Sequence, residues 1–255
     1  MYLKIKGLVV RATQYNDADL LLTLLTADQG KITAKARGAR RKKSNLIASS
    51  QLLAYCEYTL FEYRGMYTIN EAEPIELFMP LQRDIEKLSL ATYFVQAAEV
   101  ISQEDIATPG LLPLVLNSLY ALGKENASQQ QIKAVFELRL ACIAGYEPDL
   151  RGCAVCGNET PDRFDVSQGH LICGRCNTFG ENGIRMPINL GVLDSMRYVC
   201  NCDPKRIFAF RLSDENVNSM SYLTESYLST QLERGFSALD FYKTLAVEQG
   251  HIHSD

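Results

Sequence analysis

Four cysteines in the middle of the chain have the type and spacing of a metal-binding motif. Cys153, Cys156, Cys173 and Cys176 form the pattern Cys-x2-Cys-x16-Cys-x2-Cys. Each pair can wrap one side of an ion, and this spacing is typical of a tetrahedral zinc site. Four thiolates leave no open position for water, so the pattern predicts one structural Zn²⁺. The alternative is a module of free buried thiols that has lost its metal.

Further residues bear on the ligand set of this predicted zinc site. Cys200-x-Cys202 consists either of two unrelated thiols or of a substitute ligand. His170 lies close to the second cysteine pair, but a lone histidine in a hairpin is more often a surface residue. The two paired cysteine motifs therefore remain the predicted ligand set.

Positive charge is concentrated in one short segment. Residues 29–56 contain no acidic residue and seven cations, which are Lys31, Lys35, Arg37, Arg40, Arg41, Lys42 and Lys43. The whole chain has a formal charge of −4, so the remaining residues sum to −11. A local positive segment in an acidic chain favours binding to phosphates, with a solvated loop as the alternative. Such cations contact the nucleic-acid backbone and imply no reading of bases.

Aromatic residues lie near the basic segment in the sequence. A small barrel binds single strands by pairing a basic groove with stacking aromatic rings. Tyr15 and Arg64 are the best candidates here, because they lie in or beside the first and last turns of the predicted strands. The other tyrosines are more simply explained as barrel core.

Arg139 occupies an unusual position in a predicted helix. At 100° per residue it falls within the apolar face that Ile132 and Ile143 also occupy. An arginine directed at a core needs a partner. It either forms an ion pair with an internal carboxylate or lies in an open groove that receives an incoming carboxylate, such as a peptide C-terminus.

The sequence lacks the motifs of several enzyme classes. There is no phosphate-binding Gly-x4-Gly-Lys-Ser/Thr loop, no His-Glu-x2-His, and no His-x-Glu before the cysteines. ATP hydrolysis, metalloprotease chemistry and zinc-dependent deamination are therefore not predicted. We expect no enzymatic activity and no bound nucleotide.

The first 73 residues predict the barrel that would carry the basic segment. Strands are expected at 3–11, 20–26, 31–37, 52–63 and 66–73, with Pro74 ending the last. In the third, Ile32, Ala34 and Ala36 alternate with polar residues, which predicts a half-buried strand with a basic outer face. Five strands with a long insertion after the third are typical of an OB-fold, with an SH3-like barrel as the alternative.

Helical spacing begins at Pro80. Helices are expected at 80–101, 109–124, 128–145, 188–199 and 214–234, with Ser128 and Gln131 as a capping box and Gly235 ending the last. The predicted class is α+β multidomain. It comprises an OB-fold domain (1–79), a helical domain (80–150 and 188–247) with an inserted zinc module (151–187), and a disordered tail (248–255).

Composition places limits on where this chain acts. Apolar residues make up 47% of it, which is enough to form a core and excludes general disorder. No apolar run reaches 18 residues, and the N-terminus lacks the features of a signal peptide. We therefore expect a cytoplasmic, nucleoid-associated protein that does not engage a membrane.

These residues together resemble the RecO family of bacterial recombination and repair mediators. The resemblance rests on the Gly-Ala-Arg-Arg run, on the junction between helix and cysteines, and on shorter motifs. These segments are Gly7–Asp19, Gly30–Lys31, Gly38–Lys43, Arg64–Glu73, Phe136–Leu140 and Gly145–Cys156.

The resemblance implies an N-terminal OB domain, a helical domain and a zinc module. It also implies binding to single- and double-stranded DNA and annealing of complementary strands. Partners implied by the family are RecR, the C-terminal tail of the single-stranded-DNA-binding protein SSB and, indirectly, RecA, which is loaded onto SSB-coated strands. The acidic end of that tail makes Arg139 a sensible receiver on physical grounds.

The sequence therefore predicts a non-enzymatic DNA-binding mediator. Two rivals remain at this stage. A zinc-ribbon transcription regulator would discriminate among duplex sequences by at least about tenfold, whereas a mediator would respond to salt and strandedness. A zinc hydrolase would need a metal-bound water, which four sulfur ligands exclude.

Overall fold

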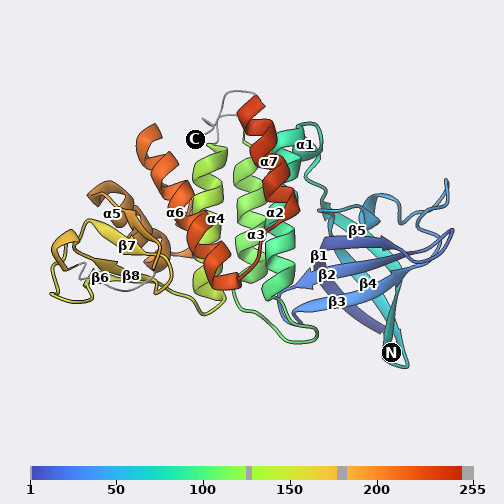
Figure 1. Cartoon of the computed structure of the whole chain (residues 1–255). Coiled ribbons are helices and arrows are strands. Elements are labelled where there is room, and N and C mark those ends of the chain that lie inside the picture. Colours follow the sequence, from blue (N-terminus) through green and yellow to red (C-terminus); the bar gives the residue numbers. More distant parts are fainter. Residues whose placement is uncertain (1, 125–127, 177–182, 249–255) are drawn as a thin grey trace. The chain divides into compact units, whose positions relative to one another are not determined.

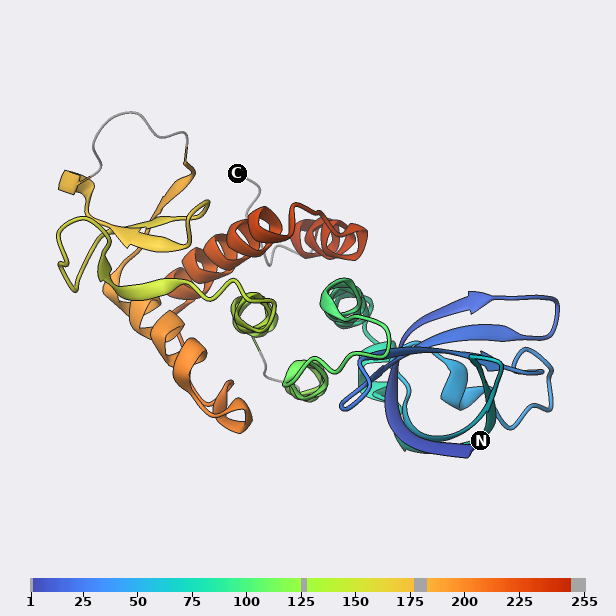
Figure 2. The same cartoon turned by 90° about the horizontal axis from the view of Figure 1, so that it is seen from below.

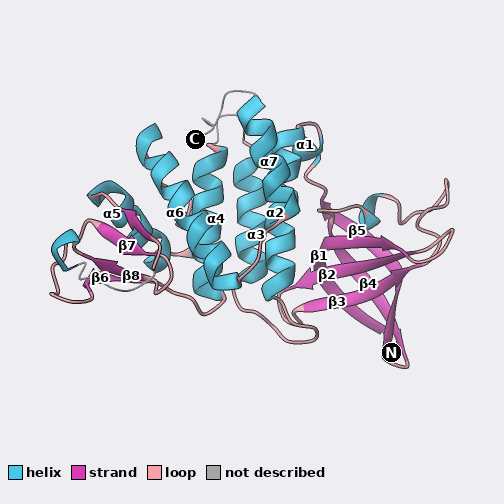
Figure 3. Cartoon of the chain, in the orientation of Figure 1, coloured by secondary structure: helices cyan, strands magenta, loops and turns pink. Residues whose placement is uncertain are grey.

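The computed structural model describes residues 2–124, 128–176 and 183–248. It divides into two compact units, Met1–Gly123 with Phe236–Asp255, and Lys124–Gly235. Figure 1 labels most of the helices and strands and colours the chain from its N-terminus to its C-terminus, and Figure 3 separates strands from helices by colour. The predicted tail at 248–255 falls almost wholly outside the described residues. The predicted domain borders remain predictions.

The first unit begins with a closed five-stranded barrel. Its strands are β1 (Tyr2–Gln14), β2 (Leu20–Thr26), β3 (Lys31–Ala36), β4 (Tyr55–Tyr63) and β5 (Met66–Glu76). They follow the order β1-β2-β3-β5-β4, and β4 pairs back onto β1. Figure 2 shows these strands curling around a common centre. All pairs are antiparallel except β3–β5, and this connectivity confirms the predicted OB-type barrel.

The alternation predicted for β3 is confirmed. Ile32, Ala34 and Ala36 are buried in the barrel core, while the residues between them are half-buried. The prediction that Pro74 ends the last strand is wrong, because β5 continues to Glu76 and pairs Pro74 with Cys56. β3 pairs with β5 only at Tyr67 and Thr68, so the later part of β5 is an edge, where proline is tolerated.

In its described residues the first unit also has four helices: α1 (Met79–Gln82), α2 (Ile85–Ile101), α3 (Leu111–Leu122) and α7 (Ser237–Glu248). The single helix predicted from Pro80 is two, because the Asp84 side chain accepts from the Lys87 N–H and starts α2. The sequence did not single out α7 as a helix. The chain returns to place it against α2, where the Tyr93 and Phe236 rings lie 5.2 Å apart.

The second unit combines helices with a small sheet. Its helices are α4 (Gln129–Ile143), α5 (Leu190–Asn201) and α6 (Asp214–Leu232), and α4 packs against the other two. The sheet order is β6 (Asp149–Cys153), β8 (His170–Ile172), β7 (Arg163–Asp165), β9 (Arg185–Pro187). Short 3₁₀ turns lie at Ala48–Ser50 in the first unit, and at Gly174–Cys176 and Pro204–Arg206 in this one. The hairpin predicted around Ser-Gln-Gly is the β7–β8 pair.

Two predicted helix ends differ in detail from the structure. Ser128 caps α4 by accepting from the Gln131 N–H, as predicted. Gln131 does not complete the capping box, because its side chain bonds the backbone of Phe210 and Leu212 instead. α6 ends at Leu232 rather than at Gly235, since Glu233 adopts the left-handed conformation that closes the helix.

A buried ionic group joins α4 to α6. The Lys133 Nζ lies 3.1 Å from a Glu137 carboxylate oxygen and 2.8 Å from one of Glu225, and Lys133 and Glu137 are almost wholly inaccessible. Thr224 donates to Glu137 as well. Burial raises the pKa of Glu137 to about 7, although the nearby positive charge of Lys133 acts in the opposite direction. In the described residues no helix is long and apolar enough to cross a membrane.

We predict that Glu137 makes stability fall as the pH rises from about 4.5 to about 7. Below this window the carboxyl is protonated in both states; within it the unfolded chain releases the proton while the folded chain retains it. Glu137→Gln should flatten this decline, whose limit is about 1.4 kcal/mol per pH unit. Urea unfolding followed by circular dichroism across this range measures the effect. Glu215→Gln, at an exposed site on α6, is the control, and parallel profiles for Glu137→Gln and wild type would contradict the prediction.

Candidate nucleic-acid interface and metal centre

Asp19 ties the turn between β1 and β2 to the start of the basic segment. One carboxylate oxygen lies 2.9 Å from the Lys35 Nζ, and the other accepts from the Gly38 N–H at 2.8 Å. Gly38 has a φ of +66°, which a residue with a Cβ rarely adopts. The Gly38 and Lys35 bonds lower the pKa of Asp19 to about 2. An ionised Asp19 therefore fixes this backbone and offsets the charge of Lys35.

Arg40 provides a second tie between the same two segments. Its guanidinium donates to the backbone carbonyls of Asn16 and Asp17 at 3.3 and 3.1 Å, and its N–H bonds the Ala18 carbonyl. These acceptors carry no formal charge, so the positive charge of Arg40 remains uncompensated there. Arg40 thus shapes the segment while contributing to its charge.

Tyr15 lies beside these ties. Its ring is 55% exposed, and the Lys35 Nζ lies 4.5 Å from the ring centroid. The distance is that of a cation–π contact. The structure therefore brings Tyr15, Lys35 and Arg40 together around the β1–β2 turn. The pairing of Leu20 with Ala36 places this turn beside the end of β3.

The remaining cations of the segment face solvent. We call residues 37–43 the basic insertion. Arg37, Arg41, Lys42 and Lys43 are exposed, and no contact of their side chains with an acidic group occurs in the described chain. Two backbone hydrogen bonds hold the segment between Gly38 and Ser44 that carries these side chains. The Arg41 N–H donates to the Gly38 carbonyl, and the Ser44 N–H donates to the Arg41 carbonyl. With Arg40, the insertion carries five cations that no acidic group among the described residues neutralises, on a backbone that hydrogen bonds hold in place.

Two predicted residues are not brought to this group. Lys31 lies at the opposite end of β3 and donates its Nζ to the Glu99 carbonyl of α2 at 3.4 Å. Arg64 lies in the β4–β5 turn, where its guanidinium stacks on the Tyr63 ring at 5.2 Å. Strand alternation correctly put Lys31 and Lys35 on the same outer face. It could not tell that the two ends of β3 have different neighbours.

The four predicted metal-binding cysteines lie together in the second unit. Cys153 ends β6, Cys156 follows in the next turn, and Cys173 and Cys176 flank the turn after β8. All four Sγ atoms are within 4.8 Å of one another, and those of Cys156 and Cys173 are 3.8 Å apart. A tetrahedron with zinc–sulfur bonds of about 2.3 Å has sulfur–sulfur edges of about 3.8 Å. The donor set and its spacing therefore fit a metal ion.

Hydrogen bonds from the surrounding chain reach two of the four sulfur atoms and favour a thiolate at Cys153. The Cys173 N–H lies 3.3 Å from the Cys153 Sγ, and the Asn158 amide donates to the Cys173 Sγ at 3.2 Å. Burial opposes ionisation of Cys153, but backbone N–H groups, that of Cys156 foremost, outweigh it and lower the pKa of the thiol to about 6. Among the described residues this is the one group of His, Cys, Asp or Glu with metal-binding geometry, and Cys200, Cys202 and His170 lie outside it.

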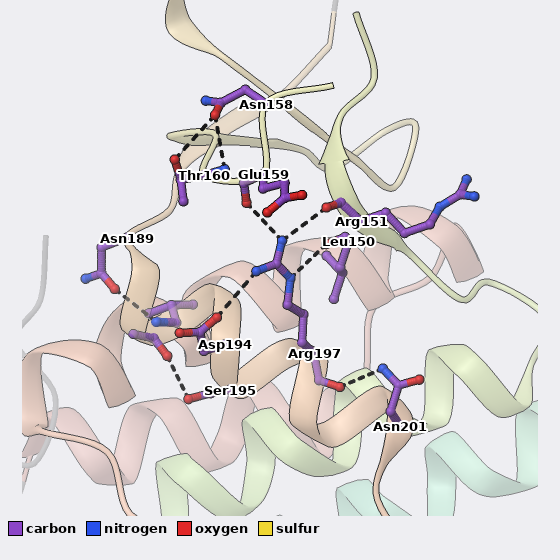
Figure 4. Close-up of polar contacts among 12 residues, drawn as sticks. Leu150, Arg151, Asn158, Glu159, Thr160, Asn189, Asp194, Ser195, Arg197 and Asn201 are labelled. Carbon is purple, nitrogen blue, oxygen red and sulfur yellow. Dashed lines mark hydrogen bonds and ion pairs between the residues drawn. The ribbon is translucent and has the colours of Figure 1, made fainter. Parts of the chain in front are cut away.

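Arg197 anchors the cysteine-bearing chain to α5, and sequence analysis did not identify it. Its guanidinium donates to the carbonyls of Leu150, Arg151 and Glu159 at 2.9, 3.3 and 3.0 Å (Figure 4). Asp194, one turn earlier, lies 3.4 Å from the same group. Backbone carbonyls leave no signature in a sequence, so no pattern could have revealed this contact.

Arg139 has acceptors of a kind that the sequence did not suggest. Its guanidinium donates to the carbonyls of Val199 and Cys200 at the C-terminal end of α5, at 3.2 and 2.5 Å. A cation at this end of a helix satisfies carbonyls that have no partner within the helix. Among the described residues Arg139 forms no ion pair with an internal carboxylate, which was one of its two predicted arrangements, and it caps the end of α5 instead. Its role as a receiver of a partner's carboxylate remains a prediction without support from this geometry.

We predict that the wild-type chain retains about one metal ion and that Cys173→Ser retains almost none. Removing one of four ligands leaves an incomplete tetrahedron, and the buried Cys173 also receives the Asn158 bond. Elemental analysis after gel filtration measures metal per chain. Cys200→Ser is the matched control and should keep its metal; loss of metal from that variant would mean that the ligand set is wrong.

Comparison with known proteins agrees with these observations. Residues 1–78 match the family model described as Recombination protein O N terminal, and residues 82–240 match Recombination protein O C terminal. The DNA repair protein RecO of Acetivibrio thermocellus is 34% identical over 96% of this chain and 97% of its own length. Those of Alkaliphilus metalliredigens and Symbiobacterium thermophilum are 32% and 30% identical, over 96% and 94% of this chain and 100% and 96% of their own lengths. A five-stranded OB-type barrel, a four-cysteine cluster and similarity over nearly the whole length together show that this chain belongs to the RecO family of DNA repair proteins.

Proposed function

We propose that this chain is a non-catalytic mediator that binds single- and double-stranded DNA and anneals complementary strands. With RecR it would promote loading of RecA onto strands coated by SSB, without using a nucleotide. The observation that carries the proposal is the basic insertion. Besides Arg40 it holds four exposed, unneutralised cations, on a backbone fixed by Asp19 and Arg40.

The chemistry of the insertion favours phosphates over base edges. Lysine and arginine side chains that neutralise phosphates release condensed counterions, so binding depends strongly on salt and little on sequence. Tyr15, half-exposed beside Lys35, adds a ring on which an unpaired base can stack. A surface that holds the backbone and leaves the pairing edges free supports annealing.

We further propose that the four cysteines hold one structural Zn²⁺. The ion would supply no chemistry to a substrate, because four sulfur ligands complete its coordination. Its contribution is folding energy for a small sheet that has little apolar core of its own. The same closed donor set argues against a zinc hydrolase.

The first test compares salt dependence. We expect Arg37, Arg41, Lys42 and Lys43 all changed to Ala to bind a labelled single strand roughly tenfold or more weakly at moderate salt. The slope of log affinity against log salt should flatten by about 2 or more, because each phosphate that is no longer neutralised removes about 0.7 from it. Fluorescence anisotropy at several salt concentrations measures both quantities. Arg40 is left intact because it also supports the β1–β2 turn.

The matched control removes four other exposed cations: Arg83, Lys205, Arg206 and Arg211. It changes net charge equally and should leave the slope near that of wild type. Equal flattening in both variants would mean that net charge rather than the insertion governs binding. Discrimination of more than about tenfold among duplex sequences would instead favour the transcription regulator.

A second test increases the charge of the same surface. Asp19→Asn keeps an amide oxygen for the Gly38 N–H but loses the charge that pairs with Lys35. We expect about two- to threefold tighter binding to a single strand at low salt, with a slope steeper by at most about 0.7. The same anisotropy titration measures it. Asp17→Asn, an exposed neighbour in the same turn, is the control, and an equal gain there would remove the special role of Asp19.

A further inference from the structure

Two cysteines outside the metal cluster lie side by side in the second unit. The Sγ of Cys142, near the end of α4, is 3.7 Å from the Sγ of Cys200, near the end of α5. Both side chains are partly accessible. Neither belongs to the group with metal-binding geometry, and the proposed DNA function does not use them. Cys200 is part of the Cys-x-Cys pair that the sequence left unassigned.

Arg139 keeps these two sulfur atoms close. It lies three residues before Cys142 on α4 and donates to the carbonyl of Cys200, so one side chain clamps both helix ends. Cys202 is oriented differently, with its Sγ 3.9 Å from the Val199 carbonyl. The neighbouring third thiol is therefore directed at backbone rather than at the pair.

The surroundings make one of the two thiols easier to ionise. The hydrogen bond with Cys200 is the largest cause that lowers the pKa of Cys142, and the Arg139 guanidinium acts in the same direction against burial and Glu147. The pKa of Cys200 shifts the opposite way, because the hydrogen bond with Cys142, then burial, and then the charge of a Cys142 thiolate all disfavour a second thiolate. The pair thus offers one thiolate and one thiol, which is the combination that thiol oxidation requires.

We propose that Cys142 and Cys200 are a modification site at which hydroperoxides form a reversible disulfide between α4 and α5. The Cys142 thiolate attacks one peroxide oxygen and breaks the O–O bond, giving a sulfenic acid and, from hydrogen peroxide, hydroxide. The Cys200 sulfur then attacks the sulfenic sulfur, the S–O bond breaks, and the leaving hydroxide takes up a proton. In total, two thiols and one hydrogen peroxide give one disulfide and two waters.

Disulfide formation requires the sulfur atoms to approach from 3.7 Å to about 2.05 Å. The link would join α4 to the helix whose Arg197 holds Leu150, Arg151 and Glu159 beside the metal cluster. Oxidation would therefore fix α5, which holds the cysteine-bearing chain, to α4. The four cysteines of the metal cluster would not change. A dithiol reductant reverses the step.

The experiment treats the full, metal-loaded chain with a small excess of hydrogen peroxide and digests it with trypsin under alkylating conditions. Cleavage after Arg139, Arg151, Arg197 and Lys205 separates the peptide 140–151 from 198–205, and the metal ligands fall in other peptides. We expect the two peptides to appear linked, two thiols to be consumed, and no metal to reach a chromogenic chelator. The wild-type result needs no substitution, so a variant that fails to fold cannot obscure it.

Substitutions assign the atoms of the link. Cys142→Ser and Cys200→Ser should abolish the linked peptide, and Cys202→Ser, the matched control in the same peptide, should retain it. The proposal is overturned if peroxide releases the metal while 140–151 stays unlinked, or if the link persists in Cys200→Ser and vanishes in Cys202→Ser.

Discussion

Closure of the barrel is the constraint on which the arrangement of the first unit depends. Strand β1 is paired on both sides, with β2 and with β4, and the ring is completed where β3 runs parallel to β5 at Ala34–Tyr67 and Lys35–Thr68. Pairing around the ring fixes where the strands begin and end relative to one another. Within this ring the β2–β3 pairing sets Leu20 opposite Ala36, so the β1–β2 turn and the insertion after β3 emerge next to each other, which is what allows Asp19 and Arg40 to join them.

The basic insertion balances two opposing electrostatic demands. Cations that are to hold a phosphate chain must remain unneutralised, yet like charges at close range disfavour a folded backbone. The structure resolves this by using a single carboxylate, Asp19, at the root of the insertion, and neutral carbonyls under Arg40. Asp19 and Arg40 fix the backbone of the insertion without neutralising its other charges. The side chains of Arg37, Arg41, Lys42 and Lys43 can therefore bind phosphates.

The second unit relies on arginines that bind backbone carbonyls. Arg197 fastens the cysteine-bearing strand to α5, and Arg139 fastens the end of α5 to α4. The first contact connects the chain that carries the cysteines to α5, and the second connects α5 to α4. The buried Lys133 likewise joins α4 to α6 through its contacts with Glu137 and Glu225. Burial there raises the pKa of the Glu137 carboxyl.

The sequence by itself determined the features that depend on local pattern. Alternation in residues 31–36 gave the buried face of β3, the spacing of four cysteines gave the metal cluster, and Ser128 gave the start of α4. Only the tertiary structure decided which cations share a surface. Lys31 and Lys35 are near in sequence, but Lys31 binds a carbonyl of α2, whereas Lys35 pairs with Asp19. The tertiary structure also decided the partners of Arg139 and Arg197 and brought Cys142 to Cys200. Those contacts join residues 38 to 61 positions apart, or bind carbonyls that every residue carries, so no local pattern encodes them.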